Sequence, residues 1–220
     1  MPDTAESPDK TRQRILTAAA EVFAETGFRN ATIRQIVEKA GANIAAVNYH
    51  FGGKNQLYTA VFEQAMSAGF AEYPVNLDLP PDPTPEQRLL AFVRSFFLRA
   101  FVGQGCGTHL GRLILREMVE PTAELNRRIT DTMRPMAEHL RQIVQQIVSR
   151  PLSDDEAFLF STSIISQVVF HKHCREVIAR MFPSRTYGRD ELEQLARHVT
   201  DFSIAGLHAM RSKAIGKRAP

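Results

Sequence analysis

Residues 11–62 read TRQRILTAAAEVFAETGFRNATIRQIVEKAGANIAAVNYHFGGKNQLYTAVF, and this stretch decides the fold. Its apolar side chains recur at helical spacing over 10–26, until Gly27 offers a stop. They recur again over 33–40, where Thr32 begins the capping-box pattern that satisfies free backbone N–H groups at a helix start. The pattern therefore predicts two helices separated by a short break.

A tight turn follows the second helix. Gly41 can adopt the left-handed backbone conformation that ends a helix, and Asn43 is a suitable N-cap for a third helix over 44–51. A Gly-Gly break then precedes a longer helix over 54–72. Two short helices joined by a glycine turn and packed on an amphipathic helix form a helix-turn-helix, which can present its second helix to the major groove of DNA.

The chain beyond this unit is also helical in pattern. The segment from Tyr73 to Pro85 holds five prolines, which helix interiors do not tolerate, so it separates an N-terminal unit from a C-terminal one. We expect the helix that contains Pro135 to kink or to form two pieces. No segment of useful length has the two-residue period of a strand. The further helices are predicted over 85–103, 108–119, 122–149, 154–173 and 189–212.

These patterns predict an all-α fold with two unequal domains. A three-helix helix-turn-helix DNA-binding domain spans 10–55, a connecting helix spans 56–72, and a larger helical domain spans 85–212. The two ends, 1–9 and 213–220, are predicted to be disordered tails.

Composition limits the class of protein. The 220 residues are 44% hydrophobic and 23% charged, which is ordinary for a globular protein, and the formal net charge of +3 permits a polyanionic partner without requiring one. Two cysteines cannot form a disulfide framework, and no apolar run approaches the roughly 18 residues of a membrane span. The first fifteen residues are polar and lack the apolar core of an export signal. We therefore expect a cytoplasmic protein with no membrane partner.

The outward face of the third helix supplies candidate contacts with double-stranded DNA. Small side chains let the helix seat deeply, alanine methyls can touch a thymine methyl, and the Asn48 amide can pair with adenine. Thr32, Tyr49, His50 and Lys54 are expected to reach phosphate oxygens, which fix register without reading sequence. An alternative is that Tyr49 and His50 only cap the small core. The full set of candidates is Thr32, Arg34, Asn43, Ala45, Ala46, Asn48, Tyr49, His50 and Lys54.

The segment from Thr11 to Phe62 resembles the DNA-binding domain of the TetR family of bacterial repressors. The shared features are an apolar helix ending in G-F, then T-x-x-x-I, A-G, and an aromatic-His-Phe motif followed by K-x-x-L-Y. The resemblance implies that the third helix enters the major groove, and that the protein is a homodimer whose C-terminal helices bind an inducer. The larger domain over 85–212 is then the ligand-binding and dimerisation domain. Many members place their aromatic residue two positions before the histidine, whereas here Asn48 stands there and Tyr49 adjoins His50. The division between base and phosphate contacts is therefore left open.

The larger domain offers candidates for an effector site. The helix over 85–103 is apolar on nearly every face, so it should run through the middle of the domain. The segments LILREMVEP and AELNRRITDTMRPMAEHL look similar to a TetR subgroup associated with drug-efflux or stress genes. We expect a small, mostly apolar effector, although ordinary core packing explains the same residues. The candidates are Phe97, Phe101, His109, Leu113, Arg116, Met133, Val168 and His171.

Two helices near the C-terminus, over 154–173 and 189–212, suit an isologous four-helix interface in a homodimer. Their broad apolar faces support this reading, and plain intrachain core is the competing account. The apolar residues of these faces are Phe160, Ile164, Ile165, Val168, Val169, Leu192, Leu195, Val199, Phe202, Ile204 and Leu207.

His171, His173 and Cys174 lie within four residues, as zinc ligands do. On a helix, however, 171 and 174 share a face while 173 points elsewhere, so we expect neither a metal nor any other cofactor.

Three functions compete. The first is a repressor that binds a palindromic operator and is released by an effector. The second is a constitutive architectural DNA-binding protein without an inducer. The third is a small helical enzyme using His109, His171 or Glu117, but the chain has no nucleophile elbow, phosphate loop, HExxH or CxxC pair, so we expect no catalytic site.

Overall fold

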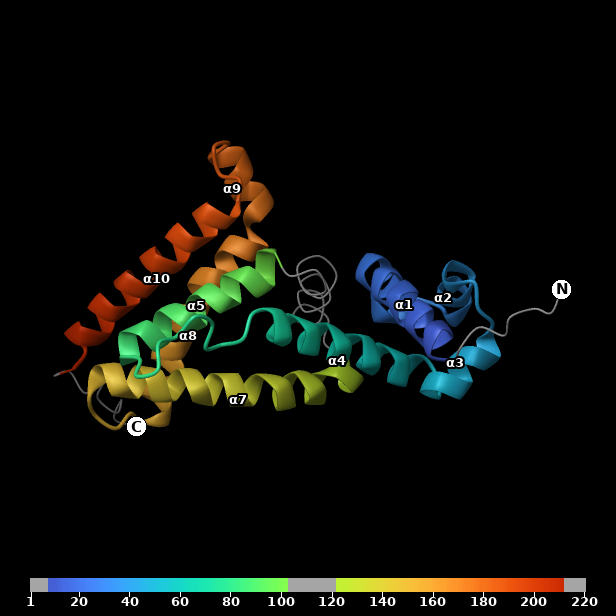
Figure 1. Ribbon diagram of the computed structural model, residues 1–220, viewed down its shortest axis with the longest axis horizontal. Helices are drawn as coiled ribbons and strands as arrows, with labels where there is room; N and C mark the ends of the chain where they lie inside the picture. The colour runs from blue at the N-terminus through green and yellow to red at the C-terminus, as the bar shows by residue number, and fades with distance from the viewer. Residues whose placement is uncertain (1–7, 103–121, 212–220) are drawn as a thin grey trace, which may run out of the picture. The chain divides into compact units, whose positions relative to one another are not determined.

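The computed structural model describes residues 8–102 and 122–211, and every regular element in these ranges is an α-helix (Figure 1), which confirms the all-α prediction. The helix predicted over 108–119 lies outside the described residues. The helices are α1 (Pro8–Asn30), α2 (Ile33–Ala40), α3 (Ile44–Phe51), α4 (Lys54–Glu72), α5 (Pro85–Phe101), α7 (Ala123–Val148), α8 (Asp154–His173), α9 (Arg175–Met181) and α10 (Arg189–Ala209).

The described residues form two compact units. The first contains the chain up to Gly69 together with 122–130, and the second contains the chain from Phe70 to 102 together with 131–211. The division falls within α4 and within α7.

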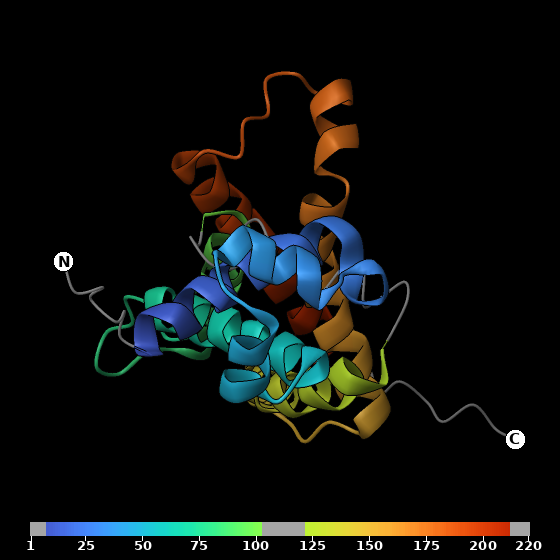
Figure 2. The ribbon, with the colours of Figure 1, turned by 90° about the vertical axis from the view of Figure 1, so that its right-hand side faces the viewer.

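The first unit is built on α1, which packs against both α2 and α3 (Figures 1 and 2). Gly27 has a left-handed φ of 77°, so the backbone breaks at the predicted stop before a last turn that reaches Asn30. The rings of Phe23 and Phe28 each lie 4.7 Å from the ring of Tyr58, measured between centroids, which anchors α4 on the end of α1. The buried side chains of this core include Ile15, Leu16, Val22, Phe23, Ile36, Val37, Val47, Phe51, Leu57, Tyr58, Val61 and Phe62.

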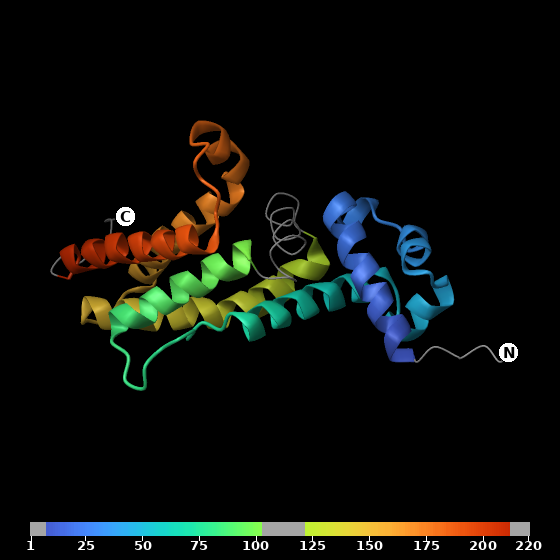
Figure 3. The ribbon, with the colours of Figure 1, turned by 45° about the horizontal axis from the view of Figure 1, so that its top comes forward.

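The second unit is organised around α5, as its apolar sequence predicted. This helix packs against α8 and runs beside α10 (Figure 3). Leu89, Val93 and Phe97 of α5 are fully buried, and they meet apolar side chains of α7, α8 and α10 in a single core. The helix begins with a complete capping box between Thr84 and Gln87.

The C-terminal ends of α7 and α10 are tied to the start of α8 by two arginines. Arg150 binds the buried carboxylate of Glu156 through both terminal nitrogens, at 2.7 and 3.1 Å. It also donates to the backbone oxygens of Met210 and Arg211. Arg211 in turn donates from Nη2 to the carbonyl oxygen of Ile147 at 2.8 Å. Carbonyl groups that have no partner within their own helices are satisfied in this way.

The helices differ from the sequence prediction in two places. Of the two alternatives for the helix that contains Pro135, a kink or two pieces, the second is wrong, because α7 continues through Pro135 from Ala123 to Val148. Pro135 and Asp131 are both exposed, so water can satisfy the carbonyl group that loses its helical partner. Helix α9 was not predicted. It has seven residues and no side-chain cap, and it begins directly where α8 ends at Cys174.

Candidate DNA-binding site

The turn between α2 and α3 is built by backbone and capping hydrogen bonds. Thr32 and Gln35 form the predicted capping box, in which the Thr32 N–H donates to Gln35 Oε1 at 2.9 Å and the Gln35 N–H donates to Thr32 Oγ1 at 3.2 Å. Gly41 ends α2 in the left-handed conformation, with φ 60°. The Ala42 N–H then donates to the carbonyl oxygen of Val37 at 2.9 Å. These bonds fix where α3 begins.

Helix α3 is held at both ends and along its inner face. Asn43 Oδ1 accepts the Ala46 N–H at 2.8 Å, and Gly52 closes the helix in the left-handed conformation. Val47 and Phe51, four residues apart, are buried. The opposite face of the helix is therefore directed toward solvent.

The outward face of α3 carries most of the predicted DNA contacts. Ala45 and Asn48 are exposed, whereas Ala46 and His50 are half-buried. The Tyr49 side chain is 82% exposed, which contradicts the alternative that this residue caps the core. Its ring meets the His50 ring edge to face, with 4.9 Å between centroids. The two aromatic side chains thus form one surface feature.

Other predicted contacts already have intramolecular partners. The Lys54 ammonium lies 4.6 Å from the centroid of the Phe28 ring and donates to the carbonyl oxygen of Arg29 at 3.4 Å. Its partial burial lowers the pKa of that ammonium. Arg34 Nε pairs with Glu38 Oε1 at 2.9 Å, in an exposed ion pair of the kind that contributes little stability. Asn43 and Thr32 serve as caps, although both are exposed.

Sequence reasoning missed Ile44, which is 53% exposed at the first position of α3. The sequence feature that could have identified it is an apolar residue directly after the N-cap, next to the small side chains of Ala45 and Ala46. Such a side chain is suited to contact with a thymine methyl group.

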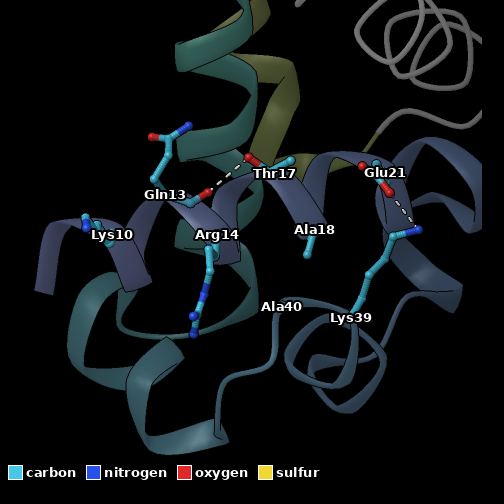
Figure 4. A pocket seen from close by; sticks show the side chains of 8 residues that line it. All are labelled: Lys10, Gln13, Arg14, Thr17, Ala18, Glu21, Lys39 and Ala40. Atoms are coloured by element: carbon cyan, nitrogen blue, oxygen red, sulfur yellow. Dashed lines mark hydrogen bonds and ion pairs between the residues drawn. The ribbon is translucent and has the colours of Figure 1, made fainter. Parts of the chain in front are cut away.

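A groove of about 530 Å³ runs between α1 and α2 (Figure 4). Across it, Lys39 Nζ lies 2.6 Å from Glu21 Oε2, and Arg14 Nη2 donates to the carbonyl oxygen of Gly41 at 3.0 Å. Sequence reasoning assigned no role to these residues. They brace α2 and its turn against α1, and so they help to hold α3 in position.

In the second unit, several predicted effector residues come together. The Phe97 ring lies 6.1 Å from the Phe101 ring and 6.0 Å from the His171 ring, measured between centroids. Val168 is buried in the same core and Met133 is half-buried on α7. His109, Leu113 and Arg116 lie outside the described residues.

Tyr187 completes this group and was not predicted. Its ring stacks on Phe101 at 4.9 Å, and its hydroxyl lies 3.3 Å from Nδ1 of His171. Glu191 accepts the backbone N–H groups of Thr186 and Tyr187 at 2.8 and 2.7 Å, which holds the loop in place. Burial, and then the positive charge of nearby Arg185, lower the pKa of His171, while burial raises the pKa of Tyr187.

The histidines of the predicted zinc-like pattern have separate partners. His173 Nδ1 lies 2.9 Å from the carbonyl oxygen of Val169, whereas His171 faces Tyr187. Within 8–102 and 122–211, no group of three His, Cys, Asp or Glu residues could hold a metal ion. Over the same ranges, no helix combines the length and apolarity needed to cross a membrane.

Comparison with known proteins matches both parts of the chain. The model of the tetR family of bacterial regulatory proteins matches residues 15–61, and the model of the C-terminal domain of the HTH-type transcriptional dual regulator CecR matches residues 85–207. The dual regulator CecR of Shigella flexneri is 26% identical over 212 residues, covering 90% of this chain and 93% of its own. The repressor NicS of Pseudomonas putida is 34% identical over 96 residues, covering 43% of this chain and 45% of its own.

A solved structure of a mutant of HlyIIR has a similar fold. It superposes with a TM-score of 0.65 at 25% sequence identity, covering 89% of this chain and all of its own.

Proposed function

Because this chain belongs to the TetR family of bacterial transcriptional regulators and carries a C-terminal domain of the CecR type, we propose that it is a ligand-responsive repressor that binds a palindromic operator as a homodimer. Members of this family regulate transcription, so the protein is a DNA-binding regulator and not an enzyme.

The observation that carries the DNA-reading part of the proposal is the solvent-facing side of α3. The helix is capped at both ends and buries Val47 and Phe51, yet it leaves Tyr49 82% exposed beside small and amide side chains. A rigid helix with such a face fits the major groove, where Asn48 would read adenine and the alanines would meet thymine methyls. Tyr49, His50, Thr32, Arg34 and Lys54 would contact the backbone phosphates.

The homodimer is proposed to form through α8 and α10. Most of the apolar residues that first suggested this interface, among them Phe160, Ile164 and Val199, are buried in the core of their own chain. The support comes instead from the exposed aromatic side chains of these helices: Phe202, one of the residues that suggested the interface, is 66% exposed, and Phe158 and Phe170 of α8 are 65% and 57% exposed. Aromatic side chains exposed to this extent favour burial against a second copy. A two-fold dimer would present its two reading helices roughly 34 Å apart, one turn of DNA.

The effector is proposed to be a small, mostly apolar molecule that contacts the aromatic group of Phe97 and Phe101, with His171 and Tyr187 as its polar partners. Such a molecule can release DNA only if it binds the DNA-free conformation more tightly than the DNA-bound one.

Fluorescence anisotropy with a labelled duplex from the chain's own promoter region tests the DNA-binding part. We expect tight binding that a scrambled duplex does not displace and that weakens steeply as salt rises, because phosphate contacts dominate the affinity. The Tyr49→Ala variant should bind more weakly, whereas Tyr49→Phe, which keeps the ring, should retain more of the affinity. If no fragment of a genomic library binds in preference to the scrambled duplex, the proposal is wrong.

An effector screen separates the repressor from an architectural protein. A repressor loses operator affinity in the presence of at least one small apolar compound that also raises its melting temperature. An architectural protein binds DNA equally well under every condition of the screen.

A further inference from the structure

A second hollow lies in the second unit, between the proline-rich segment and the helices α5 and α7. Its volume is about 400 Å³, which is within the usual range for small-molecule sites. Its lining consists of Asn76, Leu79, Pro80, Pro81, Pro83, Arg88 and His139.

The apolar walls of this pocket are rigid. Pro80, Pro81 and Pro83 have fixed φ angles and no backbone N–H to satisfy, so little conformational freedom is lost when a ligand packs against them. Two turn hydrogen bonds also hold the segment, from the Leu77 N–H to the carbonyl oxygen of Pro74 at 3.1 Å and from the Leu79 N–H to that of Asn76 at 3.3 Å.

The polar part of the lining is cationic. Arg88, on the first turns of α5, donates from Nη1 to Gln146 Oε1 at 3.4 Å, a long bond to a neutral group. No carboxylate is among the lining residues. His139 is half-buried, and burial together with the positive charge of Arg88 lowers its pKa. A neutral imidazole keeps one N–H to donate and leaves Arg88 as the charge of the pocket.

We propose that this pocket binds a small organic carboxylate, whose charged end pairs with Arg88 and accepts a hydrogen bond from His139 while its hydrocarbon part lies against the proline rings. A guanidinium matches a carboxylate with two parallel N–H donors. A divalent cation does not fit, because the lining offers it no carboxylate oxygens. The pocket is distinct from the proposed effector site, since Arg88 and Phe97 stand nine residues apart on α5, about 13 Å along its axis.

Calorimetric titration of the full chain with benzoate tests this assignment, with benzamide as the uncharged ligand of the same shape. We expect benzoate to bind and benzamide to bind at least about tenfold more weakly, since charge-assisted hydrogen bonds are roughly twice as strong as neutral ones. Arg88→Gln should weaken benzoate binding by about tenfold or more. Arg134→Gln removes the same charge from an exposed position on α7 outside the pocket and should leave benzoate binding unchanged.

A second readout follows the His139 ring by proton NMR. The ring signal is identified because it disappears in the His139→Gln variant. Bound benzoate should raise the pKa of His139, because a carboxylate favours the protonated ring. The proposal is overturned if benzoate does not bind at about 10 mM, which is about ten times a Kd of about 1 mM. It is also overturned if benzamide binds equally well, or if folded Arg88→Gln binds benzoate as the wild type does. None of these results bears on operator binding, which is measured without benzoate.

Discussion

Arg14 donates from Nη2 to the carbonyl oxygen of Gly41 at 3.0 Å and thereby joins α1 to the turn of the helix-turn-helix. The carbonyl belongs to the residue that ends α2, where helix carbonyls lack intrahelical partners and a cation is favourable. We expect Arg14→Ala to lower the free energy of unfolding by less than about 1 kcal/mol, as for one exposed hydrogen bond. Operator affinity should fall further than this loss of stability implies, because α3 loses a brace. Fluorescence anisotropy measures the loss of operator affinity, and urea unfolding of the same preparation measures the loss of stability. Unchanged operator affinity in the variant would contradict the bracing role.

Replacing each of two glycines by alanine should change the stability of the protein in opposite directions. Gly41 has φ +60° with no atom within 4 Å of an added Cβ, so Gly41→Ala strains the backbone without a clash and should cost about 1 kcal/mol. Gly206 also has free space around an added Cβ but lies inside α10, where Gly206→Ala should stabilise by roughly 0.5–1 kcal/mol. Thermal melts of the two variants check the signs. A stabilising Gly41→Ala would show that the turn does not need the left-handed conformation.

Removing the Glu156 carboxylate should be strongly destabilising. This side chain is 5% exposed and binds Arg150 through both oxygens, besides accepting the Ser153 N–H at 3.1 Å. Glu156→Ala leaves Arg150 without its counter-ion and should cost about 2–3 kcal/mol, somewhat below the range for fully buried pairs because Arg150 keeps its backbone acceptors. Asp155→Ala, at an exposed neighbouring position, is the matched control. Equal melting temperatures for the two variants would contradict the prediction that Glu156 contributes more to stability than Asp155.

Acid should destabilise the second unit through His171. Burial and Arg185, with His198 in the same sense and Glu191 opposing them, hold the pKa of His171 below its ordinary value of 6.5. As the pH falls, His171 therefore takes up a proton in the unfolded chain before it does so in the folded one. The stability that the neutral ring contributes is complete above the ordinary pKa, and it is lost as the pH falls toward the pKa of His171 in the folded chain. Urea unfolding at about pH 7.5 and about pH 5.5 should show the loss. His171→Gln should reduce the difference in the free energy of unfolding between the two pH values. If that difference is as large in the variant as in the wild type, other groups cause it.

Lys54 should contribute one phosphate contact. Its ammonium lies beside Phe28 and the carbonyl oxygen of Arg29, at the start of α4. If it also meets a phosphate, Lys54→Gln removes one contact from each subunit of the proposed homodimer and lowers the slope of log affinity against log salt by about 0.9 per subunit, or about 1.8 in all. Lys54→Arg keeps the charge and should keep the slope. An unchanged slope in Lys54→Gln would restrict the residue to packing α4 on α1.

Local chemistry made the helix boundaries predictable. Thr32, Asn43 and the two glycines that follow their helices each signal an end within a few residues, and the structure places α2 and α3 over the predicted ranges. Helix α9 gave no such signal, because it has no capping side chain and follows α8 directly. Pro135 allowed either a kinked helix or two pieces, and the sequence alone could not decide between them, because the cost of a proline depends partly on whether the carbonyl group that loses its partner can reach water.

Long-range packing was less accessible from the sequence. Apolar spacing in α8 and α10 identified a face but not what covers it, and that face is largely filled by the chain's own core. Tyr187 joined Phe101 and His171 through a loop fixed by Glu191, a contact between elements that no local pattern encodes. Likewise, the bond between Arg14 and Gly41 spans 27 positions of the chain.

The inward and outward faces of α3 have different roles, and this difference has an evolutionary consequence. Val47 and Phe51 face inward and maintain the fold, while Ala45, Asn48 and Tyr49 face solvent and make no contribution to the buried core. Substitutions at the three outward positions can therefore accumulate at little cost in stability, as is usual for exposed sites. If these positions make the proposed DNA contacts, a duplicated copy of the gene can change the operator it binds while its fold and its larger domain stay the same.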